Sequence, residues 1–266
     1  MDHRWNRNLW TLPAFLAFLP TLAAAATGLP WSSSFETGDT SEWNGFSRGN
    51  IQIIDGGASE GRYAARVDLV ANTLNDNYLE HYFGDHRRTN LDKVEEVWLK
   101  FSSKFDPGYR WPSRQSHKIA LLNLTDGVSS QRRYQVYVYV NPQGQYAIDH
   151  SDIGDWQFYG LSQNIGTPAS VRFGQWDTLK LYVRLNTPGQ ADGIVRLWIN
   201  DELKLDYTNL DLRETTDYGM NKLILSSYTS AQDGGSGRQW YDDWTLSETD
   251  PDAGTTAPPR PPVLNP

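Results

Sequence analysis

The 266-residue chain contains no cysteine, so neither disulfides nor cysteine-bound metals stabilise it. Histidine is scarce as well, with five in the whole chain, and this leaves few imidazole groups for catalysis. The sequence also lacks an excess of basic residues, since its net charge is -8. General nucleic-acid binding needs a basic surface and is therefore excluded. Stability must come from a large core or a bound metal ion.

Several catalytic motifs are also missing. The sequence has no His-Glu-x-x-His zinc motif and no phosphate-binding glycine loop. A retaining glycosidase on a β-sandwich would place closely spaced carboxylates on one strand, in a pattern such as Glu-x-Asp-x-x-Glu. The nearest acidic cluster, residues 148–152, contains no glutamate. Glycoside hydrolysis is therefore the least favoured of the carbohydrate-related functions.

The two ends of the chain do not look like parts of a folded domain. Arg4 and Arg7 precede an apolar run at 9–22 and an alanine-rich stretch at 23–26, the pattern of a secretory signal peptide. The run is too short to span a bilayer, so we expect a secreted protein, extracellular or periplasmic, without a membrane span after cleavage. Residues 250–266 are rich in proline and predict a disordered tail. The folded domain is expected at 27–249.

Alternation of apolar and polar residues dominates this central part. It is clear at 62–70, 97–105 and 134–141, where one side of each segment is apolar. Further strands are expected at 117–124, 178–185, 194–200, 222–228 and 240–247. Many short strands separated by Gly, Pro, Asn and Asp predict an all-β sandwich of two antiparallel sheets. A short helix is expected only at 73–83.

Three segments carry a resemblance to a known superfamily. They are 34–39 with the nearby Trp43, the Asp-Gly-Ile-Val-Arg-Leu-Trp-Ile-Asn-Asp stretch at 192–201, and Trp-Tyr-Asp-Asp-Trp at 240–244. Together they resemble the concanavalin A-like lectin/glucanase superfamily. That resemblance implies a jelly-roll sandwich in which the first and last strands pair. It also implies a structural calcium ion near Glu36, Gly38 and Asp243, and no organic cofactor.

Within this superfamily the chain is most similar to the jelly-roll polysaccharide lyases, especially the heparin lyase I-like group. The similarity rests on 96–101 and on Gln115-Ser116-His117-Lys118. Jelly-roll alginate lyases similarly place Gln and His two residues apart and an arginine on an early strand, here Arg66. The sequence departs from their Arg-x-Glu-x-Arg and Tyr-x-Lys-x-Gly-x-Tyr patterns, so the resemblance leaves the substrate open.

A lyase acting on a uronate must neutralise the carboxylate, remove the neighbouring C5 proton and protonate the departing oxygen. The resemblance implies that His117 removes the C5 proton and that Arg66 and Gln115 neutralise the carboxylate. The departing oxygen would be protonated by one of three tyrosines, Tyr137, Tyr139 or Tyr228. An alternative for His117 is a structural role, since Ile119 and Leu121 share its strand parity and point toward a core. The expected substrate contacts are Lys118, Gln135, Tyr228, Trp98 and Arg114.

The leading hypothesis is a lyase that cleaves an acidic, uronate-containing polysaccharide by β-elimination and acts as a monomer. The second hypothesis is a non-catalytic, lectin-like binding module. It would stack sugars on aromatic side chains, namely Trp98, Trp156, Tyr137, Tyr139 and Trp198. The composition suits both, with 11 Trp, 14 Tyr and 9 Phe.

Overall fold

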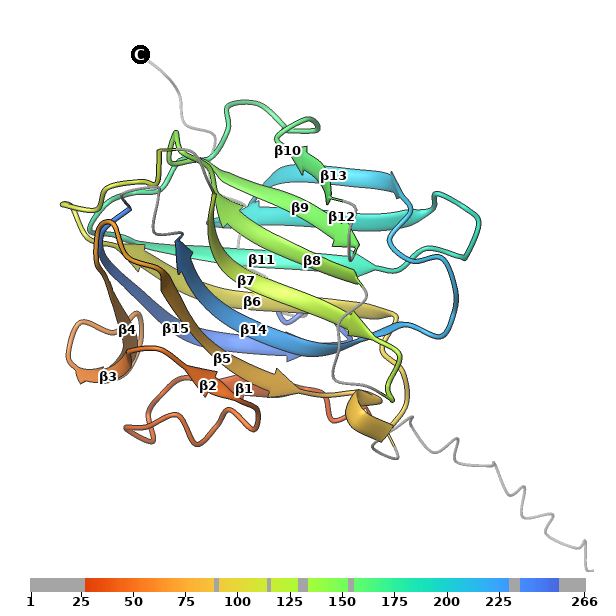
Figure 1. Cartoon of the computed structure of the whole chain (residues 1–266), viewed down its shortest axis with the longest axis horizontal. Helices are drawn as coiled ribbons and strands as arrows, with labels where there is room; N and C mark the ends of the chain where they lie inside the picture. The colour runs from red at the N-terminus through yellow and green to blue at the C-terminus, as the bar shows by residue number, and fades with distance from the viewer. Residues whose placement is uncertain are drawn as a thin grey trace, which may run out of the picture.

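The computed structural model describes residues 27–88, 91–113, 116–128, 134–152, 156–229 and 235–253. The expected signal peptide, residues 1–26, and residues 254–266 of the expected tail lie outside this range. The described chain forms two antiparallel sheets stacked face to face (Figure 1). This confirms the all-β jelly-roll sandwich predicted from the sequence.

The first sheet, called sheet A, has eight strands in the order β13-β12-β11-β6-β15-β4-β3, with β1 paired to β15. Its strands are β1 (Trp31–Ser33), β3 (Ile51–Asp55), β4 (Tyr63–Leu69), β6 (Glu96–Phe105), β11 (Trp176–Arg184), β12 (Gly193–Ile199), β13 (Glu202–Leu210) and β15 (Gly237–Ser247). β1 and β15 pair from Trp31 opposite Leu246 to Ser33 opposite Trp244. The first and last strands are therefore neighbours, as expected.

The second sheet, called sheet B, has seven strands in the order β10-β9-β8-β7-β14-β5-β2. They are β2 (Ser47–Arg48), β5 (Asn75–Tyr82), β7 (His117–Thr125), β8 (Tyr134–Val140), β9 (Tyr146–Asp152), β10 (Trp156–Gly160) and β14 (Gly219–Thr229). This sheet lies in front in Figure 1, with sheet A behind it. Each sheet has one face toward the other and one face outward.

The core lies between the sheets and is rich in aromatic rings. Trp244 is 1% exposed and stacks on Phe101 at a centroid distance of 4.3 Å, while Trp43 meets it edge-on at 5.4 Å. Aliphatic residues that alternate along the strands fill the rest, such as Val97 and Leu99 on β6. This continuous apolar layer stabilises a chain that has no disulfides.

Every strand expected from alternation is present, within a few residues at each end. The helix expected at 73–83 is wrong, because Asn75–Tyr82 forms β5 between β14 and β2. The asparagines of this segment hold the extended chain: the Asn75 amide donates to Thr229 Oγ1 at 2.8 Å, and Asn77 Nδ2 donates to the Ser227 carbonyl at 3.3 Å. Hydrogen bonding to β14 thus overrides the local pattern.

The start of the expected tail is ordered, which corrects the boundary at 250. Asp250–Ala253 form a turn against the outer face of sheet A. Lys180 Nζ lies 3.1 Å from Asp250 Oδ1 and 2.9 Å from Asp252 Oδ2, and Lys100 Nζ lies 2.6 Å from Asp252 Oδ1. These ion pairs hold the segment against sheet A.

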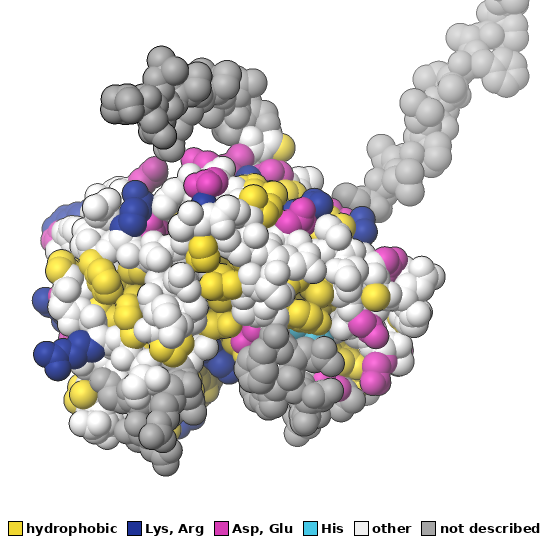
Figure 2. Space-filling model, turned by 90° about the horizontal axis from the view of Figure 1, so that it is seen from above, with side chains coloured by type: hydrophobic (Ala, Val, Ile, Leu, Met, Phe, Trp, Pro, Cys, Tyr) yellow, Lys and Arg dark blue, Asp and Glu magenta, His cyan; other side chains and the backbone are white. Residues whose placement is uncertain are grey.

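Large hydrophobic side chains that remain exposed are dispersed along the described chain: Phe46, Val70, Leu74, Val128, Ile165 and Phe173. From above, hydrophobic side chains form small groups between charged and other polar ones (Figure 2). No helix in the described ranges is long and apolar enough to cross a membrane.

Candidate functional site

A hollow of about 450 Å³ lies on the outer face of sheet B, across β5, β14, β7 and β8. Outward-pointing side chains of these four strands line it: Asp76, Tyr78, Glu80, Lys118, Leu121, Asn123, Gln135, Lys222, Ile224, Ser226 and Tyr228. Most of them carry hydrogen-bonding groups, whereas the opposite face of the same strands is apolar. The hollow is therefore suited to a polar ligand rather than to an apolar one.

Lys118 occupies a central position in this face. Tyr139 is its cross-strand partner on β8, and Tyr228 is its partner on β14. The Lys118 ammonium group lies 4.8 Å from the centre of the Tyr137 ring and 5.9 Å from that of Tyr228. One cation is thus surrounded by three phenol rings, all of them among the site residues predicted from the sequence.

Tyr137 and Tyr139 lie beside the hollow, toward β9, where they pack against Leu121 and are 2% and 6% exposed. The Tyr137 hydroxyl donates to Asp149 Oδ2 at 3.2 Å, and Gly160 N–H donates to the other oxygen at 3.1 Å. Burial raises the pKa of Asp149 to about 6, although these hydrogen bonds oppose the shift. Burial, and then the charge of Asp149, raise the pKa of Tyr139 above its ordinary value. Tyr139 is therefore protonated at neutral pH and able to donate a proton.

The amide side chains of Asn123 and Gln135 face each other across β7 and β8. Both line the hollow, and the buried Asn123 Oδ1 has no hydrogen-bond partner. On the other side, Lys222 pairs with Glu80 at 3.0 Å, and Glu80 also accepts a hydrogen bond from Tyr82 at 2.6 Å. The amides can hydrogen-bond a carboxylate, while the charge of Lys222 is already balanced.

His117 is in the interior, so its expected role as an exposed base is wrong. It is 0% exposed, Tyr109 Oη lies 3.0 Å from its Nδ1, and Gln239 Oε1 lies 2.6 Å from its Nε2. Burial lowers the pKa of His117 to about 4, so the ring is neutral. Ile119, of the same strand parity, is also in the core, so the alternative of a structural role is the one that fits His117. A register shift between Lys118 and Ala120 then turns Leu121 outward.

Arg66 and Trp98 are on the opposite side of the molecule, on the outer face of sheet A, and cannot act in the hollow. Arg66 on β4 pairs with Asp68 at 3.0 Å and hydrogen-bonds Gln52 at 2.8 Å. Trp98 on β6 packs against Tyr182 at a centroid distance of 4.5 Å. Alternation along each strand assigned them to an outer face, but it could not say to which sheet each strand belongs. Gln115 and Arg114 lie outside the described residues.

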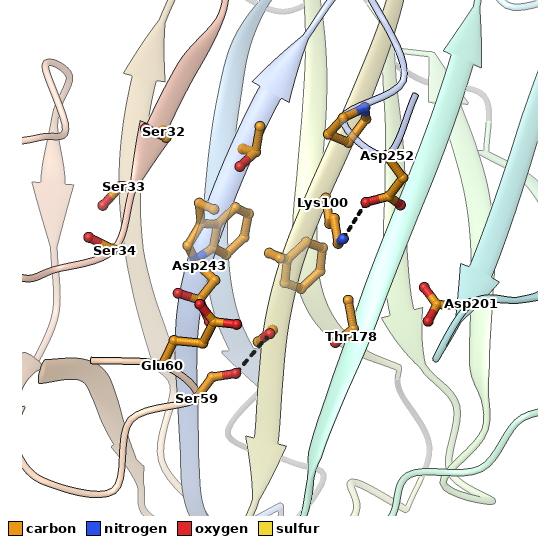
Figure 3. Close-up of a pocket in the computed structure, with 15 residues that line it drawn as sticks. Ser32, Ser33, Ser34, Ser59, Glu60, Lys100, Thr178, Asp201, Asp243 and Asp252 are labelled. Atoms are coloured by element: carbon orange, nitrogen blue, oxygen red, sulfur yellow. Dashed lines mark hydrogen bonds and ion pairs between the residues drawn. The ribbon is translucent and has the colours of Figure 1, made fainter. Parts of the chain in front are cut away.

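Of the residues expected to bind calcium, the two acids Glu36 and Asp243 lie close enough for their charges to interact. Asp243, at a bulge of β15, lies close to Glu60 and Glu36, and the charges of these two acids raise its pKa beyond the effect of burial. Figure 3 shows Asp243 beside Glu60. Glu36 Oε1 already accepts two backbone N–H groups, those of Arg62 and Tyr63.

Within the described ranges, no group of three or more His, Cys, Asp or Glu side chains is arranged to hold a metal ion. These acids therefore make the site negatively charged, but their carboxylates alone do not form a set of ligands around a metal ion. A calcium ion there would need backbone carbonyls, such as one near Gly38, or water for most of its ligands. The calcium site remains a prediction.

Sequence reasoning missed Asn123, Asp149 and the Lys222–Glu80 pair. Asn123 is a polar residue in an otherwise apolar strand, which is a signal that could have been used. Asp149 was seen only as part of an acidic cluster, since its contact with Tyr137 depends on the pairing of β8 with β9.

The model of the family Polysaccharide lyase 14 matches residues 130–247. No curated protein matches the sequence. Among solved structures, the PL-14 alginate lyase from Aplysia kurodai is similar, with a TM-score of 0.60 and 13% identity over 84% of this chain and 99% of that one.

An endo-β-1,4-glucuronan lyase from Trichoderma reesei has a TM-score of 0.57 and 14% identity over 82% of this chain and 95% of that one. An alginate lyase from a Chlorella virus has a TM-score of 0.57 and 11% identity over 78% and 93%. At these identities the structural likenesses show the fold. The family match confirms the predicted enzyme class, a polysaccharide lyase and hence a carbon–oxygen lyase. The finer resemblance to the heparin lyase I-like group remains a prediction.

Proposed function

We propose that this protein is a secreted lyase that cleaves a uronic-acid-containing polysaccharide by β-elimination in the hollow of sheet B. The observation that carries the proposal is the position of Lys118, with Tyr139 and Tyr228 on the two neighbouring strands. The similar structures whose names specify a substrate act on alginate and glucuronan, both polymers of uronates. These two polymers are the first substrates to test.

Lys118 is our choice for the base. With His117 in the core, the amino group of Lys118 is a basic nitrogen in the hollow that faces the phenol rings. Lysine acts as a general base where burial and neighbours favour its neutral form. In this role it takes the proton from C5 of the uronate. The electron pair left on C5 forms the C4=C5 double bond as the bond between C4 and the glycosidic oxygen breaks.

The carboxylate of the substrate needs hydrogen-bond donors so that the C5 proton becomes acidic enough to remove. The amides of Asn123 and Gln135 supply them in our proposal, in place of Arg66 and Gln115. The departing oxygen takes its proton from a tyrosine next to Lys118. Tyr139 and Tyr228 hold the two neighbouring positions, and each carries a phenol hydroxyl that can supply this proton.

The test is to incubate the purified protein with alginate, polyglucuronate and other uronate polymers while following ultraviolet absorbance of the new double bond. We expect absorbance with at least one polymer. Tyr139→Phe and Tyr228→Phe then identify the proton donor, which loses about 10²-fold or more in kcat. Tyr182→Phe, on the outer face of sheet A, is the matched control. Retention on a polymer without any product would instead favour the lectin-like module.

A further inference from the structure

The outer face of sheet A carries a second row of sugar-binding side chains, far from the hollow. Five outward residues are direct cross-strand neighbours: Trp176 on β11, Lys104 on β6, Trp240 on β15, Arg66 on β4 and Gln52 on β3. We call these five the outer row. Neighbouring strands are about 4.8 Å apart, so the row is about 19 Å long, the length of several sugar rings.

The centre of the outer row is a lysine between two indoles. Lys104 Nζ lies 4.5 Å from the Trp176 ring centre and 5.0 Å from that of Trp240. It also donates a hydrogen bond to the Gly57 carbonyl at 2.8 Å. Cation–π attraction and this hydrogen bond hold the ammonium group in place between the rings. Within the described part of the chain, no carboxylate lies within ion-pair distance of it.

The other end of the outer row continues the same chemistry. Arg66 is 26% exposed at its side chain and donates to Gln52 Oε1 at 2.8 Å, with Asp68 as its ion-pair partner. The guanidinium group of Arg238 lies over the indole of Trp240, 5.7 Å from the ring centre, and pairs with Asp106. Partly exposed indoles that alternate with cations suit a chain of sugar rings that bear carboxylates.

A parallel row on the same face differs from the outer row at its lysines. Arg66 of the outer row is also paired, with Asp68, but Lys104 forms no ion pair within the described residues. There Lys100 and Lys180 stand next to Trp198, but both lysines are already paired with Asp252, and Lys180 also with Asp250. A hollow of about 450 Å³ adjoins the second row, with Lys100 and Asp252 in its lining (Figure 3). Its lining includes Glu60 and Asp243, which would repel an anionic chain. An anionic chain would therefore follow the outer row rather than this hollow or the second row.

We propose that the outer row binds a further segment of an anionic polysaccharide without cleaving it. The charge of Lys104 and the two flanking indoles select the ligand class, a polyuronate. The rings that flank Lys104 are indoles, which lack the phenol hydroxyl that would protonate a leaving oxygen. This inference rests on the proposed function for the choice of polymer. Its consequence is that the protein holds a long polymer on one face while the hollow of sheet B acts on another segment or chain.

The test uses the full protein in a Lys118→Ala background, so that no polymer is degraded during the measurement. Electrophoresis in gels that contain sodium alginate or polyglucuronate measures affinity as retardation. We expect Trp176→Ala with Trp240→Ala to weaken binding about ten-fold or more, as removal of aromatic anchors does. Trp98→Ala is the matched control, an indole of the same face that lies beside a neutralised lysine, and it should leave binding unchanged.

A second variant guards against misfolding. Lys104→Gln with Arg66→Gln keeps both indoles and removes the two charges, so it should abolish most of the salt-sensitive part of the retardation. Unchanged retardation in both variants overturns the proposal, as does equal retardation of the parent protein by the neutral polymer hydroxyethyl cellulose. Absence of lyase product with every polymer would reject the proposed function, yet these binding measurements would still be decisive.

Discussion

The two outer faces of the sandwich each present a lysine between two aromatic residues on neighbouring strands, but the aromatic residues differ. On sheet B, Lys118 stands between Tyr139 and Tyr228, and on sheet A, Lys104 stands between Trp176 and Trp240. A phenol carries an exchangeable proton that it can give to a leaving group, whereas an indole donates only a hydrogen bond. The same arrangement therefore supports chemistry on one face and binding alone on the other.

The surroundings strengthen this difference. Next to Lys118, Tyr137 donates a hydrogen bond to Asp149, whose pKa is raised by burial, so a hydrogen-bonded pair of titratable groups lies beside the hollow. Lys104 donates a hydrogen bond to the Gly57 carbonyl, which does not titrate, and a buried acid, Asp242, acts on Lys104 through its charge. Perturbed titratable groups that cluster in a hollow are typical of catalytic sites.

The comparison is tested most strongly at the two lysines. Lys118→Arg keeps the positive charge but removes the base, because arginine stays protonated in proteins. We expect kcat to fall by about 10²–10⁴-fold in Lys118→Arg, and Lys104→Arg to leave kcat on short oligosaccharides unchanged. Steady-state rates of double-bond formation provide the measurement. An active Lys118→Arg enzyme would mean that Lys118 only neutralises charge.

The layer between the two faces gives a second test, because it contains His117. We expect the folded His117→Gln variant to have a kcat within a few-fold of that of the parent protein, since the buried side chain of residue 117 does not contact the substrate. Its effect should be on stability. The folded pKa of about 4 is below the unfolded value of 6.5, so the unfolded state binds more protons between these pH values.

The free energy of unfolding therefore falls as the pH drops from 6.5 toward 4, by at most about 1.4 kcal/mol per pH unit from this residue. Urea unfolding at several pH values measures it, with His117→Gln as the control that lacks this dependence. Parallel pH profiles of the parent and the variant would show that His117 is not a buried neutral group.

The smallest expected effect concerns calcium at the edge of sheet A. If calcium relieves the repulsion between Asp243, Glu36 and Glu60, a chelator should lower the midpoint of thermal unfolding by a few degrees. Asp243→Asn should remove this response, and Asp39→Asn, on the same exposed loop as Glu36, should not. Identical midpoints with and without chelator would remove calcium from the description of this fold.

Much of the site was accessible to prediction because alternation along a strand fixes which side chains share a face. Tyr137 and Tyr139 were expected opposite the valines of β8, and Lys118, Gln135 and Tyr228 among the substrate contacts, and these five are together on sheet B. The exposed role expected of His117 failed because His117 shares the core face with Ile119. The sequence of β7 is apolar on both faces, so parity alone did not decide between them.

By itself the sequence determined the all-β class, the strands and the face of most side chains, because the period of two and the turn residues act locally. Only the tertiary structure decided which strands belong to the same sheet. That choice separated Arg66 and Trp98 from Lys118 and brought Asp149 and Asn123 to it. Strand order depends on hydrogen bonds between residues far apart in the chain, such as Lys118 with Tyr228, and no local pattern encodes them.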